Sequence, residues 1–129
     1  MRRRDAVPTL LAATWLLAVL STAACIGDPG SELTLQIHNT TNRLLRVTVS
    51  RMWDMPKAPP HEEIGIEVIV EPGATKDAAI SLAAGDYAGP VRAYSDGRLI
   101  FCQNYDYRTG PRARVTWSVD IVEGHITCQ

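Results

Sequence analysis

Alternation of apolar and polar side chains begins at residue 33 and predicts a chain built from β-strands. Apolar residues occupy every second position from Leu33 to Ile37, and a second alternating run extends from Leu45 to Val49. A spacing of two places the apolar side chains on one face of a strand, so both runs are expected to be half-buried. Residues 39–42 (Asn-Thr-Thr-Asn) between them suit a turn with local hydrogen bonds, and the two strands are expected to form a hairpin.

Alternation continues through the middle of the chain. It returns over residues 64–70 and ends at a Pro-Gly pair that is typical of a type II turn. Further short strands are expected over residues 80–82 and 87–93. Pro90 cannot donate a hydrogen bond to a neighbouring strand, so the strand that contains it is expected at a sheet edge or at a bulge.

The last third of the chain predicts two more strands. Asp96-Gly97 is the signal of a tight hairpin turn. Residues 99–102 are apolar at every position, which favours a central strand buried on both faces. The longest alternation covers residues 114–121, and the side chains expected to face inward are Val115, Trp117, Val119 and Ile121. About seven strands at these spacings, with no helix expected after residue 25, predict an all-β sandwich.

One stretch carries a resemblance to a known group of folds. Leu82, Gly85 and Tyr87, followed by further small and apolar residues up to Gly97, form a Leu…Gly-x-Tyr pattern. This pattern resembles the start of a late strand in fibronectin type III and related immunoglobulin-like sandwiches, and transthyretin-like domains share it. The resemblance implies a single immunoglobulin-like β-sandwich domain over residues 33–129, after an N-terminal signal helix.

The N-terminal residues have the three parts of a secretory signal. Arg2 to Arg4 give a basic start, residues 6–27 contain no charged side chain, and small residues precede Cys25. Arginines before an apolar run favour the cytoplasmic side of a membrane, so the residues after the run are expected outside the cytoplasm.

Thr22-Ala23-Ala24-Cys25 resembles the lipobox of bacterial lipoproteins. The resemblance implies a signal peptide over residues 1–24, lipid attachment at Cys25, and a short tether over residues 25–32. The protein would then be anchored by its lipid to the extracytoplasmic face of a bacterial membrane. Two alternatives stay open: the apolar run of roughly 20 residues could remain as an uncut membrane anchor, or an ordinary signal peptidase could leave Cys25 as a free thiol.

The cysteine count agrees with lipid attachment. The chain has three cysteines, Cys25, Cys102 and Cys128, and an odd count in an exported protein leaves one thiol to explain. If Cys25 carries lipid, Cys102 and Cys128 remain as a pair that an oxidising compartment would close into a disulfide. The alternative is a pair of buried, unpaired thiols.

Composition after residue 25 excludes one class of partner. This part of the chain has ten Lys and Arg residues against thirteen Asp and Glu residues, a net charge of −3 with His neutral. The basic residues are dispersed, so nucleic acid is not an expected partner. Only seven aromatic residues follow residue 25, and the core is therefore expected to consist mainly of Val, Ile, Leu and Ala.

Residues 51–63 interrupt the alternation and contain three prolines, which predicts a loop. Met52, Met55 and His61 bring thioether and imidazole groups together, and these are ligands for Cu(I). The nearby indole of Trp53 could contact the cation. The alternative is that Trp53 and a methionine fold back over the core as a lid.

A second candidate surface follows the apolar strand over residues 99–102. Tyr105, Tyr107 and Arg108 suit polar recognition, although ordinary cross-strand pairing would account for them as well. Together with Trp53, these three residues are the candidate ligand-binding residues.

The sequence contains no Gly-x-Ser-x-Gly and no His-Glu-x-x-His motif. We therefore expect a non-catalytic binding or structural module of the cell envelope, without a cofactor and with an envelope protein or a glycan as its partner. Two alternatives are a copper-handling extracytoplasmic protein that uses the 51–63 loop, and a small envelope hydrolase.

Overall fold

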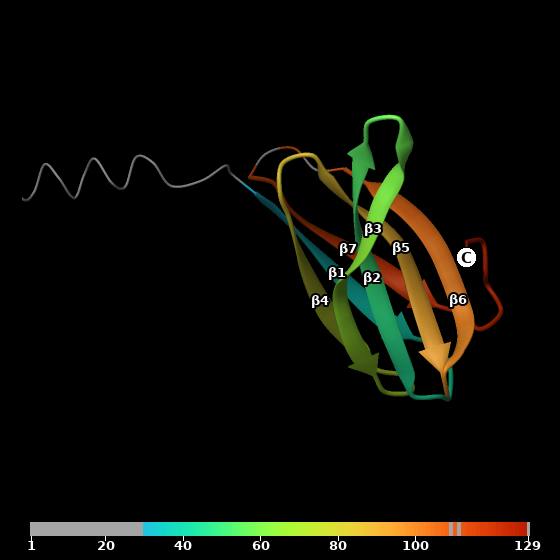
Figure 1. Ribbon diagram of the computed structural model, residues 1–129. Helices are drawn as coiled ribbons and strands as arrows, with labels where there is room; N and C mark the ends of the chain where they lie inside the picture. Colours follow the sequence, from blue (N-terminus) through green and yellow to red (C-terminus); the bar gives the residue numbers. More distant parts are fainter. Residues whose placement is uncertain (1–29, 109, 111, 129) are drawn as a thin grey trace, which may run out of the picture.

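The computed structural model describes residues 30–108, 110 and 112–128, which form a two-layer β-sandwich (Figure 1). One sheet has the strand order β4-β1-β7 and the other has the order β3-β2-β5-β6. The described residues contain no helix, so the all-β sandwich expected from the sequence is confirmed. The strands are β1 (Ser31–Asn39), β2 (Leu45–Met55), β3 (Ala58–Val70), β4 (Thr75–Leu82), β5 (Asp86–Ser95), β6 (Arg98–Tyr107) and β7 (Arg114–Ile121).

The expected signal peptide and the candidate lipid-attachment residue, Cys25, lie outside the described residues. Within the described part of the chain, no helix has the length and apolar character that crossing a bilayer requires.

The core lies between the two sheets and follows the alternation in the sequence. In β1 and β2, every apolar side chain of the two alternating runs is at most 1% exposed. Val119 and Ile121 of β7 are equally buried, whereas Trp117 of the same strand is 37% exposed. The period-two pattern therefore identified the inward face correctly, and Trp117 lies where this face reaches the rim of the sandwich.

The first strand does not form a hairpin with the second, and this expectation was wrong. β1 pairs antiparallel with β4 and parallel with β7, while β2 belongs to the opposite sheet. The residues between them form a corner through which the chain changes sheets. The expected local bonding is present, because the backbone N–H of Thr41 donates to Oδ1 of Asn39 at 2.9 Å.

Residues 51–63 are not a loop, and this expectation was also wrong. They form the outer half of the β2–β3 hairpin, which projects from one end of the sandwich (Figure 1). Pro56 and Lys57 make the turn, and Lys57 adopts a positive φ of 57°. Pro59 and Pro60 are tolerated because β3 is an edge strand and its register shifts at this point.

Pro90 lies in β5, a central strand, and of the two expectations for Pro90 the bulge is the correct one. The register shifts beside it in the pairing with β6 and near it in the pairing with β2. The expected Asp-Gly turn is confirmed, because Asp96 and Gly97 have φ values of 48° and 77° and join β5 directly to β6.

The apolar strand β6 is an edge strand and not the expected central strand. A register shift at Ile100 gives β6 one more residue than β5, and Ile100 and Phe101 both enter the core. The C-terminal segment then covers the open edge of β6. The N–H of Cys102 donates to the carbonyl of His125 at 2.9 Å, and the N–H of Thr127 donates to the carbonyl of Cys102 at 2.8 Å.

Candidate functional site

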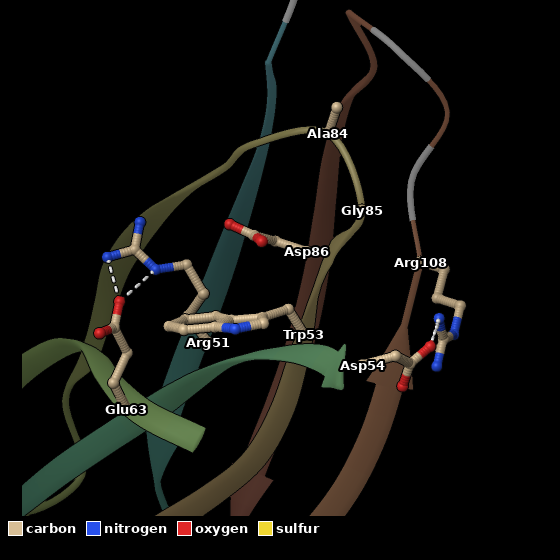
Figure 2. A pocket seen from close by; sticks show the side chains of 8 residues that line it. All are labelled: Arg51, Trp53, Asp54, Glu63, Ala84, Gly85, Asp86 and Arg108. Atoms are coloured by element: carbon tan, nitrogen blue, oxygen red, sulfur yellow. Dashed lines mark hydrogen bonds and ion pairs between the residues drawn. The ribbon is translucent and has the colours of Figure 1, made fainter. Parts of the chain in front are cut away.

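An open pocket of about 790 Å³ lies at the end of the sandwich from which the β2–β3 hairpin projects (Figure 2). Its walls come from the hairpin, from the turn between β4 and β5 together with the first residue of β5, and from Arg108, which directly follows β6. The lining residues are Arg51, Trp53, Asp54, Glu63, Ala84, Gly85, Asp86 and Arg108.

Arg51 and Glu63 form one wall of the pocket. They face each other across the hairpin, and Oε1 of Glu63 lies 2.7 Å from Nη2 and 2.9 Å from Nε of Arg51. Nη1 of Arg51 also donates to the carbonyl of Ser81 in β4, at 3.3 Å. This guanidinium therefore fastens the hairpin to the opposite sheet and holds the Glu63 carboxylate in a fixed position.

A second ion pair stands on the other side of the pocket. Nη1 of Arg108 lies 3.2 Å from Oδ2 of Asp54, and the Arg108 guanidinium carbon lies 3.9 Å above the centre of the Tyr87 ring. The hydroxyl of Tyr87 donates to Oδ1 of Asp54 at 3.4 Å. Burial raises the pKa of Tyr87, with a smaller contribution from the negative charge of Asp54. The hydrogen bond to Asp54 likewise raises the pKa of Arg108.

Trp53 lies between the two ion pairs (Figure 2). It pairs with His61 across the hairpin, and the two rings stack with centroids 4.1 Å apart at an interplanar angle of 25°. His61 does not line the pocket. The imidazole therefore supports the indole from behind, and the remaining indole surface is left for the pocket.

The β4–β5 turn supplies a third carboxylate. The N–H of Ala83 donates to Oδ2 of Asp86 at 3.2 Å, and the N–H of Asp86 donates to the carbonyl of Ala83 at 3.0 Å. Gly85 has a φ of 88°, a conformation that few residues other than glycine adopt. The pocket thus surrounds an aromatic surface with three carboxylates and two guanidinium groups.

The structure separates the four candidate recognition residues. Trp53 and Arg108 line the pocket, whereas Tyr105 and Tyr107 pack against Trp117, with ring centroids 5.8 Å and 4.4 Å apart. These three aromatic rings close the rim of the sandwich between β6 and β7. Burial raises the pKa of Tyr105, as expected for a packed phenol.

The three candidate copper ligands do not converge. Met52 pairs with Glu62, while the next residue, Trp53, pairs with His61. Successive residues of a strand point to opposite faces, so Met52 and His61 lie on different sides of the hairpin. The thioether of Met52 packs closely against Gly89 of β5. Met55 lies at the hairpin tip, 44% exposed. The alternative of a Cu(I) site assumed a loop here, whereas the chain forms two paired strands that keep these three side chains apart.

No group of three or more His, Cys, Asp or Glu side chains within the described residues could hold a metal ion.

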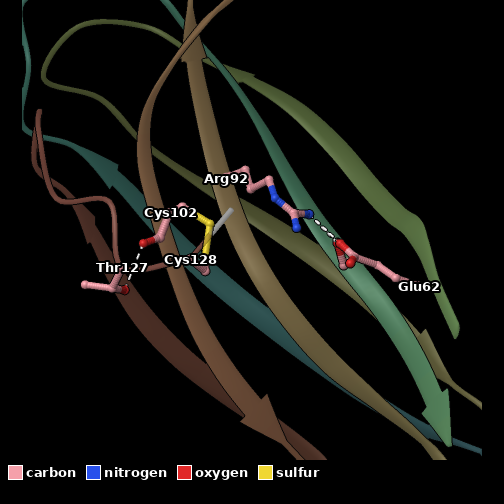
Figure 3. Close-up of a disulfide and its surroundings, with 6 residues drawn as sticks. Glu62, Arg92, Cys102, Thr127 and Cys128 are labelled. Atoms are coloured by element: carbon pink, nitrogen blue, oxygen red, sulfur yellow. Dashed lines mark hydrogen bonds and ion pairs between the residues drawn. A yellow bond between two sulfur atoms is a disulfide. The ribbon is translucent and has the colours of Figure 1, made fainter. Parts of the chain in front are cut away.

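The two cysteines after residue 25 were expected to form a pair. The structure places the sulfur atoms of Cys102 and Cys128 at bonding distance, with Cα atoms 5.2 Å apart (Figure 3). The Thr127 hydroxyl donates to the Cys102 carbonyl at 3.0 Å beside them.

Four charged lining residues were not predicted from the sequence, namely Arg51, Asp54, Glu63 and Asp86. Three of them belong to the segment that was interpreted as a loop. A signal was present, since Pro56-Lys57 can serve as a two-residue turn and residues on either side of it then pair across a hairpin. A regular two-residue turn there would pair Arg51 with Glu62, and the register shift between Trp53 and Met55 moves the partner of Arg51 to Glu63.

Comparisons with protein families, with curated proteins and with solved structures found no match. The fold and the pocket define only the class of protein, which is a seven-stranded, two-layer β-sandwich with an aromatic, ion-paired pocket at one end.

Proposed function

We propose that this protein is an exported, lipid-anchored and non-catalytic binding module of the bacterial cell envelope, and that the pocket around Trp53 is its ligand site. The observation that carries the proposal is the indole of Trp53, which is partly exposed, is stacked on His61 and lies between two ion pairs. Aromatic residues and arginines are enriched where proteins bind partners, and a binding pocket combines an apolar surface with a few fixed polar groups.

The lining does not supply the groups of a hydrolase that works through a serine or cysteine nucleophile. A hydrolase that works through a nucleophile needs a serine, cysteine or similar group beside a base. The eight lining residues include no serine, cysteine or histidine. Their charged groups are instead engaged with one another, Arg51 with Glu63 and Arg108 with Asp54. Such pairs fix donors and acceptors around the indole before a ligand arrives, which lowers the cost of ordering them on binding.

Export and anchoring are supported by the N-terminal sequence alone. Mass spectrometry of the mature protein, purified from the membranes of an exporting host, tests them. We expect an acylated Cys25 at the N-terminus, and accumulation of an unprocessed or differently cleaved form for Cys25→Ala. An unmodified N-terminus at Cys25 or Ile26 in the wild type would contradict the anchoring.

Cross-linking in intact cells tests the ligand site even though the ligand is unidentified. A photoreactive phenylalanine derivative placed at residue 53 is expected to give an adduct with an envelope component. The same group at residue 117, an aromatic position outside the pocket, is the matched control and is expected to give none. Equal cross-linking at both positions, or none at residue 53, would remove the pocket as the binding site.

A further inference from the structure

The hairpin tip and the start of the described chain lie at the same end of the sandwich (Figure 1). Ser31, the first residue of β1, pairs with Leu82 at the end of β4. Trp53 pairs with Asp86, just beyond the turn that follows β4. The chain that precedes Gly30 therefore joins the domain at the end from which the hairpin projects.

The lengths of chain involved are short enough for the hairpin tip and a lipid on Cys25 to reach the same membrane surface. Arg51 contacts the carbonyl of Ser81, whose residue pairs with Glu32, and this places Arg51 near the level of the start of β1. Met55 lies four residues further out, which is about 13 Å along a strand. The six steps from Cys25 to Ser31 span at most about 22 Å. A lipid on Cys25 would hold the tip within reach of the bilayer.

The composition of the tip suits a lipid interface. Residues 55–60 read Met-Pro-Lys-Ala-Pro-Pro, contain no acidic residue and are exposed. Met55 supplies apolar surface and Lys57 a cation that anionic headgroups attract. Trp53 lies just behind the tip, and tryptophan favours the boundary between lipid and water.

The acidic residues of the hairpin are paired with arginines. Asp54 pairs with Arg108, and Glu63 pairs with Arg51. Glu62 pairs in the same way with Arg92 of β5. These pairs offset the carboxylate charges that an anionic membrane would otherwise repel, and Lys57 remains at the tip itself.

We propose that the tip of the β2–β3 hairpin, residues 55–60, is a second membrane contact that rests in the interface of the bilayer holding the lipid anchor. This inference rests on the proposed anchoring at Cys25. With two points of contact, the domain is held in one orientation, and the pocket around Trp53 opens at the level of the lipid headgroups.

Lipid quenching of a single tryptophan tests the contact. The full chain is purified in its lipidated form and reconstituted into vesicles of phosphatidylethanolamine and phosphatidylglycerol, with and without bromine on the acyl chains. Trp53→Phe and Trp117→Phe remove the other tryptophans of the processed protein. Met55→Trp then reports on the tip, and Arg98→Trp reports on the opposite end of the sandwich, where Arg98 is exposed.

The expected result is loss of emission from the Met55→Trp protein in brominated vesicles, several-fold greater than the loss from the Arg98→Trp protein. Adding Lys57→Glu should reduce the loss at the tip in anionic vesicles and have little effect in vesicles of phosphatidylethanolamine and phosphatidylcholine. Equal emission from the tip reporter in both kinds of vesicle, or stronger quenching at residue 98, would overturn the inference. Mass spectrometry of the same sample separates the two failures: an unlipidated Cys25 contradicts the proposed function, whereas a lipidated protein with an unquenched tip contradicts this inference alone.

Discussion

The side-chain amide of Asn39, at the end of β1, donates to the backbone carbonyl of Val70, at the end of β3, over a distance of 3.1 Å. β1 and β3 belong to different sheets, so this single side chain ties the two layers together at one end of the sandwich. The same amide nitrogen also lies 2.7 Å from the carbonyl of Arg43 and 3.1 Å from that of Glu71.

Asn39 is fully buried, and its replacement should be costly. Asn39→Ala leaves three carbonyl groups without this donor, and we expect a loss of about 2–3 kcal/mol in the free energy of unfolding. Urea denaturation followed by circular dichroism measures the loss. Asn42→Ala, in the same turn but exposed, is the control and should change stability by less than about 0.5 kcal/mol. Similar effects from both variants would contradict the role given to Asn39.

The Cys102–Cys128 pair should stabilise the C-terminal segment. The two cysteines are 26 residues apart, and closing a loop of this size is expected to contribute about 3–4 kcal/mol through the unfolded state. Cys128→Ser should lower the melting temperature and expose the segment after Glu123 to protease. Cys25→Ser is the control and should leave the stability of the domain unchanged. Two alkylatable thiols at residues 102 and 128 in the unreduced, exported protein would disprove the bond.

The lowered pKa of Glu62 predicts that the free energy of unfolding depends on pH. The hydrogen bond from Arg92 holds the pKa of Glu62 below its ordinary value of 4.5, and burial opposes part of this effect. Because the folded protein lowers this pKa, the stabilisation is present above about pH 4.5 and is lost as the pH falls through the lowered value. The side chain of Glu62 is 35% exposed, so solvent screening limits the contribution to about 1 kcal/mol or less.

Glu62→Gln should therefore lower stability at neutral pH and have a smaller effect near pH 3. Urea denaturation at a series of pH values measures the difference between the wild type and the variant. Glu67→Gln, at a more exposed carboxylate on the same strand, provides the comparison. A difference that stays constant from pH 7 to pH 3 would exclude the Arg92–Glu62 pair as its source.

Gly65 should not tolerate a side chain. A Cβ atom at this position would overlap Cδ1 of Ile80 and would lie 3.1 Å from the carbonyl oxygen of Val49. Ile80 belongs to β4 in the opposite sheet, so Gly65 allows the two layers to approach at this edge. Gly65→Ala is expected to cost about 1–3 kcal/mol. Ile80→Val removes Cδ1, and the double variant should lose less than the sum of the two single losses. Strict additivity would refute this contact.

The sequence predicted the parts of the fold that depend on a single strand or a single turn. Alternation gave the buried faces of β1, β2 and most of β7, because burial of one face imposes a period of two wherever a strand forms. The Asp96-Gly97 turn was predictable because its backbone geometry favours those residue types.

The strand partners could not be predicted in the same way. The turn cluster beginning at Asn39 is compatible with a hairpin, but its amide bonds to Val70, a residue 31 positions away that no local pattern indicates. The residues of β6 are apolar because a bulge turns two of them into the core and the C-terminal segment covers the strand. A central strand would show the same apolar pattern, so the sequence alone does not distinguish the two cases. The pocket was half predicted for a related reason: Trp53 and Arg108 stood out by type, whereas Arg51 and Glu63 gain their position only from the hairpin register.

The parallel pairing of β1 with β7 constrains the order in which the chain can fold. Glu32 pairs with Arg114, so the first strand must wait for nearly the whole chain before its sheet can close. Contacts between such distant residues carry a large loop-closure entropy and are typical of slow folding. Until residues 114–121 are present, β1 can pair only with β4, and one edge of the three-stranded sheet stays open. The four-stranded sheet needs no residue beyond Tyr107, so the two layers of the sandwich become complete at different points along the chain.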